Sequence, residues 1–156
     1  MDDQLLEIVG KHRLTESLLD AGIEVAFPAR DRGIDLIAYS DTDVQLGRFV
    51  ALPIQMKSAS KTCFSIAQKY SKFPDMLIAY VWNLSEPGNT RIFVLNQDEA
   101  VRIASAMKYT ETDSWINKGT YVVTRPSTKL VEMLRQYEVS RTTWSTQIRK
   151  IVARKL

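Results

Sequence analysis

The chain has 156 residues, of which 45% are hydrophobic and 25% charged, a composition typical of one soluble globular domain. It contains one cysteine and one histidine, which disfavours an internal disulfide, a zinc site built on these residues, and Ser-His-Asp or Cys-His catalysis. No apolar run approaches the roughly twenty residues that cross a bilayer, and acids rather than bases follow Met1, so we expect a cytoplasmic protein.

The net charge of +3 is unevenly distributed along the chain. Residues 125–156 carry 8 Lys and Arg against 2 Asp and Glu, which leaves a net charge of −3 on residues 1–124. A basic C-terminal end favours a polyanionic partner.

The first half of the chain predicts one helix followed by three strands. Apolar residues recur at helical spacing over residues 3–20, and Gly22 follows as a stop signal. Strands are predicted over residues 23–27, 34–39 and 49–56, with polar connections at 28–33 and 40–47. Because these connections are short, antiparallel pairing of neighbouring strands is favoured.

The second half alternates between strand and helix patterns. A short helix is expected between Phe64 and Phe73, followed by strands over residues 76–82 and 91–95, a helix over 98–108, an edge strand over 119–124 and a helix from about Pro126. From Val139 onward, apolar and basic residues share a helical pattern. We therefore expect one domain over residues 1–136 and a basic amphipathic helix over 137–156 that packs on it or extends it.

Chemistry-bearing residues lie on two neighbouring predicted strands. Asp35 stands in the run Gly33–Ala38, and Gln55 and Lys57 stand in the run Pro53–Lys57. Side chains two apart in a strand point the same way, so Gln55 and Lys57 share a face, and a hairpin would bring Asp35 to them. Phosphodiester hydrolysis needs a hard cation, and magnesium prefers oxygen ligands such as these residues offer. The pattern therefore indicates a metal-dependent nuclease site.

These motifs and the order of the elements resemble the PD-(D/E)XK nuclease superfamily, which includes Holliday junction resolvases, Mrr-like restriction endonucleases and some homing endonucleases. The resemblance covers roughly residues 10–82. It implies an α/β, restriction-endonuclease-like three-layer fold, with a central mixed β-sheet flanked by helices. In that family a Glu on the first helix, an Asp in the second strand and an (E/D/Q)-x-K in the third surround one or two magnesium ions. Here these places are occupied by Glu16, Asp35, Gln55 and Lys57.

The resemblance implies a role for each of these residues. Magnesium, or manganese in its place, would be held by Asp35, Gln55 and the Met56 carbonyl, with Glu16 acting through water. Lys57 could orient the attacking water or stabilise charge on the phosphate. Gln55 departs from the commonest pattern, in which an acid stands there, but glutamine is usual in the Mrr-like branch. Asp31 could be a loop acid or a second ligand.

The resemblance implies a magnesium-dependent DNA endonuclease of restriction, homing or junction-resolving type. Cutting both strands with one site per chain calls for a homodimer or a higher even homo-oligomer. An alternative, favoured by Gln55, is a weakly active or inactive DNA-binding protein or a subunit of a larger DNA-processing assembly, and another is a protein interaction module built on the C-terminal helix. Candidate DNA contacts are Ser58, Lys61, Lys69, Arg141, Arg149 and Lys150.

Overall fold

The computed structural model of the chain describes residues 1–40 and 49–154. Within this part, the side chains of residue 40 and residues 151–154 are not described. The polar connection expected over residues 40–47 lies almost wholly outside the described residues, as do the last two residues of the C-terminal helix expected over 137–156.

Helices and strands alternate along the chain. The first half contains α1 (Asp3–Asp20), β1 (Glu24–Ala26), β2 (Leu36–Ser40), β3 (Val50–Ser58), β4 (Phe64–Ala67), the 3-10 helix η1 (Gln68–Lys72), β5 (Leu77–Trp82) and β6 (Arg91–Asn96). The second half contains α2 (Gln97–Ala106), η2 (Tyr109–Glu111), α3 (Asp113–Lys118), β7 (Thr120–Val123), α4 (Thr128–Leu134), η3 (Arg135–Tyr137) and α5 (Arg141–Arg154).

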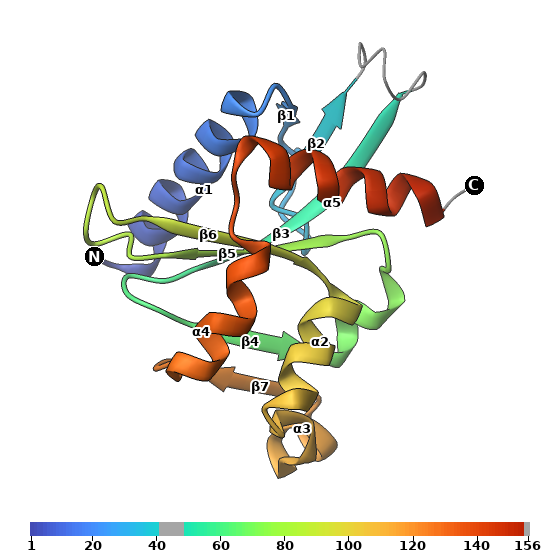
Figure 1. Cartoon of the computed structure of the whole chain (residues 1–156). Helices are drawn as coiled ribbons and strands as arrows, with labels where there is room; N and C mark the ends of the chain where they lie inside the picture. The colour runs from blue at the N-terminus through green and yellow to red at the C-terminus, as the bar shows by residue number, and fades with distance from the viewer. Residues whose placement is uncertain (41–48, 155–156) are drawn as a thin grey trace.

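Five strands form a mixed central sheet in the order β1-β2-β3-β5-β6. Its strand pairs are antiparallel except β3 and β5, which run parallel. Strands β4 and β7 form a separate antiparallel pair on one side of this sheet (Figure 1). The predicted α/β fold, a central mixed sheet flanked by helices, is confirmed.

The segment expected as a short helix between Phe64 and Phe73 begins instead as strand β4. Phe64 and Ile66 are buried and pair with Val123 and Tyr121 of β7, a partner more than fifty residues further along the chain. Within the segment 64–73, the helical residues are those of the 3-10 helix η1. The short helix α3 is an element that the sequence pattern did not predict.

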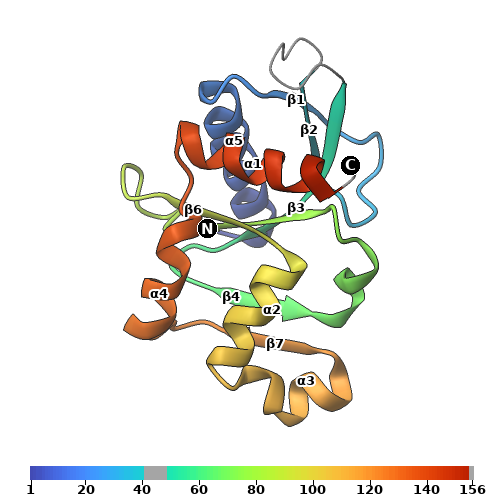
Figure 2. The same cartoon turned by 45° about the vertical axis from the view of Figure 1, so that its right-hand side comes forward.

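The central sheet is covered on both faces, giving three layers. Helices α1 and α5 cover one face, and helices α2 and α4 with the β4–β7 pair cover the other (Figure 2). Leu14, Leu18 and Trp144 pack in the first core, whereas Phe64, Tyr80 and Phe93 belong to the second. Among the described residues, no helix is both long and apolar enough to cross a bilayer.

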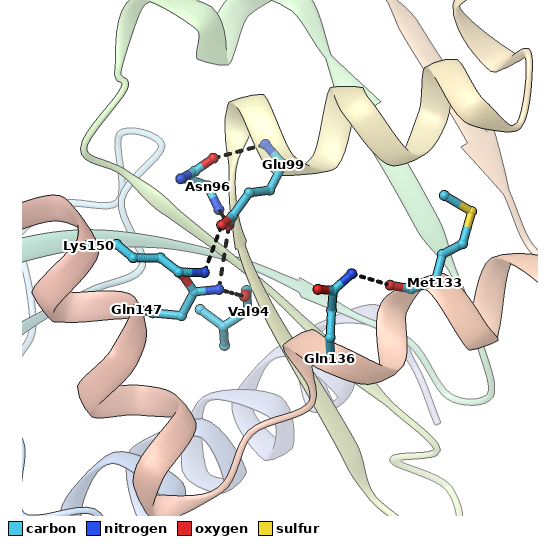
Figure 3. Close-up of polar contacts among 7 residues, drawn as sticks. All are labelled: Val94, Asn96, Glu99, Met133, Gln136, Gln147 and Lys150. Atoms are coloured by element: carbon cyan, nitrogen blue, oxygen red, sulfur yellow. Dashed lines mark hydrogen bonds and ion pairs between the residues drawn. The ribbon is translucent and has the colours of Figure 1, made fainter. Parts of the chain in front are cut away.

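Helix α5 is fastened to the first face by buried polar contacts. The Trp144 indole Nε1 donates a hydrogen bond of 3.0 Å to Ser17 Oγ on α1. The buried Gln147 side chain donates through Nε2 to the Val94 carbonyl on β6, at 2.8 Å (Figure 3). These contacts tie α5 both to α1 and to the sheet.

A buried carboxylate at the start of α2 contacts two side chains of α5. Glu99 is 5% exposed, and its Oε2 accepts the Asn96 backbone N–H at 3.0 Å in a capping box. Gln147 Nε2 lies 3.4 Å from Glu99 Oε2, and Lys150 Nζ lies 3.3 Å from Glu99 Oε1 (Figure 3). Helix α5 therefore packs as part of the folded domain.

The chain between η3 and α5 runs beside strand β6. Glu138 forms an isolated antiparallel bridge with Phe93, and the Val139 N–H donates to the Ile92 carbonyl at 2.8 Å. The Arg91 guanidinium binds the Glu138 carboxylate through two hydrogen bonds of 2.8 Å each. This segment covers part of the outer edge of the sheet.

Candidate active site

A cavity of about 440 Å³ lies between the N-terminal half of α1, the loop before β2 and the C-terminal half of β3. Strand β4 and η1 complete its wall. Asp35, Gln55, Met56 and Lys57 line this cavity, so the structure brings these sequence-predicted residues together.

Asp35 is held at the entrance to strand β2 by the backbone of β3. Its N–H donates to the Ile54 carbonyl at 2.9 Å, and its Oδ2 accepts the Met56 N–H at 2.6 Å. Oδ2 also accepts from Gln55 Nε2 at 2.8 Å. The antiparallel register pairs Leu36 with Ile54, which is why Asp35 meets the residues that follow Ile54.

Asp35 is 6% exposed, and burial raises the pKa of its carboxyl group above the usual range. The negative charges of Asp31 and Glu7 raise this pKa further, whereas the Met56 N–H and the Lys11 ammonium lower it. Burial is therefore the main reason that the neutral form of this carboxyl group is favoured, and two neighbouring carboxylates add to it.

Three carboxylates converge beside this group. Glu7 from α1, Asp31 from the loop before β2, and Asp35 each offer an oxygen, and these oxygens all lie within 4.8 Å of one another. Asp31 is oriented by its own loop, because its Oδ1 accepts the Gly33 N–H at 3.2 Å. Such a cluster of hard oxygen ligands suits a divalent cation.

Glu16, the helix glutamate expected at the site, is not brought to this cavity. It lies nine residues after Glu7, which at about 100° per residue places it on the opposite side of α1 and about 13 Å further along the axis. Its carboxylate pairs with Arg13 at 3.2 Å, and both residues line a separate cavity of about 650 Å³. The helix glutamate at the site is Glu7. The signal that identifies it is its alignment with Gly10 and Leu14 on the buried face of α1.

Two lysines and a tyrosine form another part of the cavity wall. Lys57 Nζ lies 5.3 Å and Lys69 Nζ 5.2 Å from the centre of the Tyr70 ring. Tyr70 is 5% exposed, and all three residues line the cavity. An aromatic ring attracts cations at this range, so Tyr70 holds both ammonium groups at one side of the cavity.

The other candidate DNA contacts lie in different surroundings. Ser58 lines the cavity, but its Oγ is buried and has no hydrogen-bond partner among the described residues. Lys61 is exposed in the connection after β3. Arg141 pairs with Asp20 at 3.3 Å, beside the C-terminal end of α1, and Lys150 pairs with Glu99. Lys69 lines the cavity, whereas Arg141 and Lys150 do not. Arg149 is exposed on α5.

No protein-family model and no curated protein matches the chain at the level of sequence. Among solved structures, the bacterial homing endonuclease I-Ssp6803I is similar, with a TM-score of 0.51 over 99% of this chain and 96% of that chain. The chain shares its fold. Sequence identity is 15%, so this similarity concerns the arrangement of the elements and not the identity of individual site residues.

Proposed function

We propose that this protein is a magnesium-dependent DNA endonuclease of the PD-(D/E)XK type. The observation that carries the proposal is a single cavity lined both by the clustered carboxylates of Glu7, Asp31 and Asp35 and by Lys57. Phosphodiester hydrolysis needs a cation and a positive charge near the phosphate, and such a cavity offers a place for each. The shared fold with a homing endonuclease supports DNA as the substrate.

The donor set fits magnesium or manganese. The oxygens of Glu7, Asp31 and Asp35, together with the Met56 carbonyl, are hard ligands, and the cluster identified among the described residues contains no histidine or cysteine. Burial is the main cause of the raised Asp35 pKa, and the charges of Asp31 and Glu7, which add to it, are what a divalent ion would neutralise. When bound, the ion supplies charge neutralisation at the phosphate and activation of water.

The side chains around this position have distinct tasks. Asp35 is fixed by the Met56 N–H, so its carboxylate is oriented before any ligand arrives. Glu7 and Asp31 add ligand oxygens from a helix and a loop. Lys57 contributes a positive charge to the phosphate, and Lys69 extends that charge toward the exposed surface of η1.

The proposal extends to the assembly and location of the protein. Residues 1–136 carry the proposed site, and α5 (Arg141–Arg154) packs on them. Cleavage of both DNA strands by one site per chain requires two copies, so we propose a homodimer or a higher even homo-oligomer acting in the cytoplasm.

A matched pair of variants on α1 tests the site. With supercoiled plasmid or branched DNA and Mg²⁺, Glu7→Gln should lose at least about tenfold in rate and Lys57→Ala about 100-fold. Glu16→Gln should cleave as the wild type does, because Glu16 pairs with Arg13 outside the cavity. A wild type no more active than Asp35→Ala or Lys57→Ala on both substrates would contradict the proposal.

Gln55 favours a second candidate, a nuclease-fold DNA-binding protein without strong catalytic activity. A neutral amide binds magnesium more weakly than a carboxylate does. Salt-sensitive DNA binding that is indifferent to Mg²⁺ and is not followed by cleavage would support this candidate over the first.

A further inference from the structure

The Gln55 carboxamide bridges two oxygens of the candidate cation site. Its Nε2 lies 2.8 Å from Asp35 Oδ2 and 3.1 Å from the Met56 carbonyl oxygen. A carbonyl oxygen only accepts hydrogen bonds, and so does an ionised carboxylate, so the amide must turn its NH₂ group toward both. Its two donor hydrogens are therefore directed at oxygens that suit a divalent cation.

The surroundings explain why a donor is favourable at this position. Asp35 is nearly buried, and the carboxylate oxygens of Glu7 and Asp31 lie within 4.8 Å of its own. A carboxylate at position 55 would add a further acceptor beside these oxygens, where the amide supplies two partial positive charges. In the metal-free protein, glutamine at position 55 is therefore more favourable than glutamate.

We propose that the Gln55 amide is an internal placeholder for the cation. In the metal-free protein its NH₂ group donates to Asp35 Oδ2 and to the Met56 carbonyl, and on cation binding the amide turns over, so that its oxygen joins the ligands. This inference rests on the proposed function, since the cation is the one that the nuclease would use. It assigns to Gln55 the regulation of cation binding at that site. An acid at position 55 would bind the cation more tightly, but in the metal-free cavity it would add negative charge that no donor compensates.

The side-chain amide signals of ¹⁵N-labelled protein test the rotation directly, during a titration with Mg²⁺ alone. The Gln55 NH₂ signals, assigned by their absence from Gln55→Met, should shift and exchange faster with solvent as Mg²⁺ binds. Gln97 is the control, because its Nε2 likewise donates to a backbone carbonyl, that of Ala67 at 2.9 Å, away from the cavity. Its signals should not change. Mg²⁺ binding that leaves the Gln55 signals unchanged would overturn the proposal, and so would an absence of any Mg²⁺ binding.

Calorimetry and thermal unfolding of two variants provide a second measurement. Gln55→Met should bind Mg²⁺ about tenfold more weakly than wild type, and Gln55→Glu about tenfold more tightly, because ligand charge and number set affinity. Without Mg²⁺, Gln55→Glu should melt below wild type, and its gain on adding Mg²⁺ should exceed the wild-type gain. Equal Mg²⁺ affinity in wild type and Gln55→Met would overturn the proposal.

A parallel DNA cleavage assay separates this inference from the proposed function. Cleavage by a wild-type protein whose Gln55 amide does not respond to Mg²⁺ would refute the placeholder and leave the nuclease. An amide that responds in a protein that cleaves neither plasmid nor branched DNA would support the placeholder and refute the nuclease.

Discussion

Helix α1 and strand β3 are in close contact where Gly10 faces Ser58. A Cβ atom on Gly10 would lie 2.2 Å from Ser58 Oγ, and 3.2 and 3.3 Å from Ser58 Cβ and Leu84 Cδ1. The Ser58 hydroxyl is itself buried and has no hydrogen-bond partner among the described residues. Substituting alanine at each of the two positions should therefore change stability in opposite directions.

The expected magnitudes follow from these contacts. Gly10→Ala gains about 1 kcal/mol of helix propensity but incurs a steric cost near 3 kcal/mol, for a net loss of about 2 kcal/mol. Ser58→Ala removes an unsatisfied buried hydroxyl and should stabilise the protein by about 1 kcal/mol. In the double variant only the contacts at 3.2 and 3.3 Å remain, so most of the propensity gain is recovered. The double variant should be about 2 kcal/mol more stable than the sum of the two single stability changes predicts.

Urea unfolding of the wild type, both single variants and the double variant measures this coupling. A Gly10→Ala variant as stable as the wild type, or a double variant that equals the sum of the single ones, would refute the steric argument. Magnesium affinity gives an independent reading, because Glu7 lies one helical turn before Gly10. Displacing α1 should weaken Mg²⁺ binding in Gly10→Ala, and the double variant should restore it.

Three further predictions concern the cavity and α5. Burial and, to a lesser extent, neighbouring acids raise the pKa of Asp35, so the metal-free wild type loses stability as pH rises through that pKa. Asp35→Asn should therefore be more stable than the metal-free wild type at neutral pH but not at strongly acidic pH. A stability difference between the two that calorimetry finds to be independent of pH would contradict this. Tyr70→Phe keeps the aromatic ring and should retain cleavage, whereas Tyr70→Leu should lower kcat about tenfold because Lys57 loses its contact with the ring. Equal kcat values for the two variants would argue against a role of the ring in positioning Lys57. Gln147→Leu removes a donor shared by a buried carbonyl and a buried carboxylate and should cost about 1–3 kcal/mol in denaturant unfolding. Lys150→Met removes a half-exposed ammonium and leaves Glu99 its hydrogen bonds from Asn96 and Gln147, so it should cost less than about 1 kcal/mol, and similar losses in the two variants would count against this reasoning.

The strand-borne part of the candidate site could be predicted from sequence because its determinants are local. Gln55 and Lys57 share a face through the two-residue period of a strand, and Asp35 precedes the neighbouring antiparallel strand. The orientation of the Gln55 amide could not be predicted, since it depends on which atoms of Asp35 and Met56 face it after folding.

The helix glutamate shows where local pattern was insufficient. Glu7 and Glu16 are both exposed acids of α1, and the resemblance to a known motif selected the second. Only the buried face of the folded helix, which carries Gly10, Leu14 and Leu18, shows that Glu7 continues this face toward β3 and that Glu16 does not. Apolar residues outside this face also fit helical spacing, so the sequence alone did not show which face of the helix is buried.

The misassigned segment after residue 63 has a different cause. Strand β4 consists of four residues, Phe64–Ala67, and pairs with Thr120–Val123 of β7. A strand this short has little periodicity of its own, so its conformation is set by a partner distant in sequence. The longer strands β3 and β5 and the helix α2 are specified by their own residues, and these were predicted close to their observed positions.

The segment around Glu138 that lies along strand β6 also limits how copies of this protein can assemble. An uncovered sheet edge offers unpaired backbone groups to another chain, and here Glu138 and Val139 already occupy part of that edge. The opposite edge is strand β1, which has three residues, Glu24–Ala26. Neither edge is suited to continuing the sheet from one molecule into the next, a property that resists fibrous aggregation. The proposed pairing of two copies would therefore not extend the central sheet.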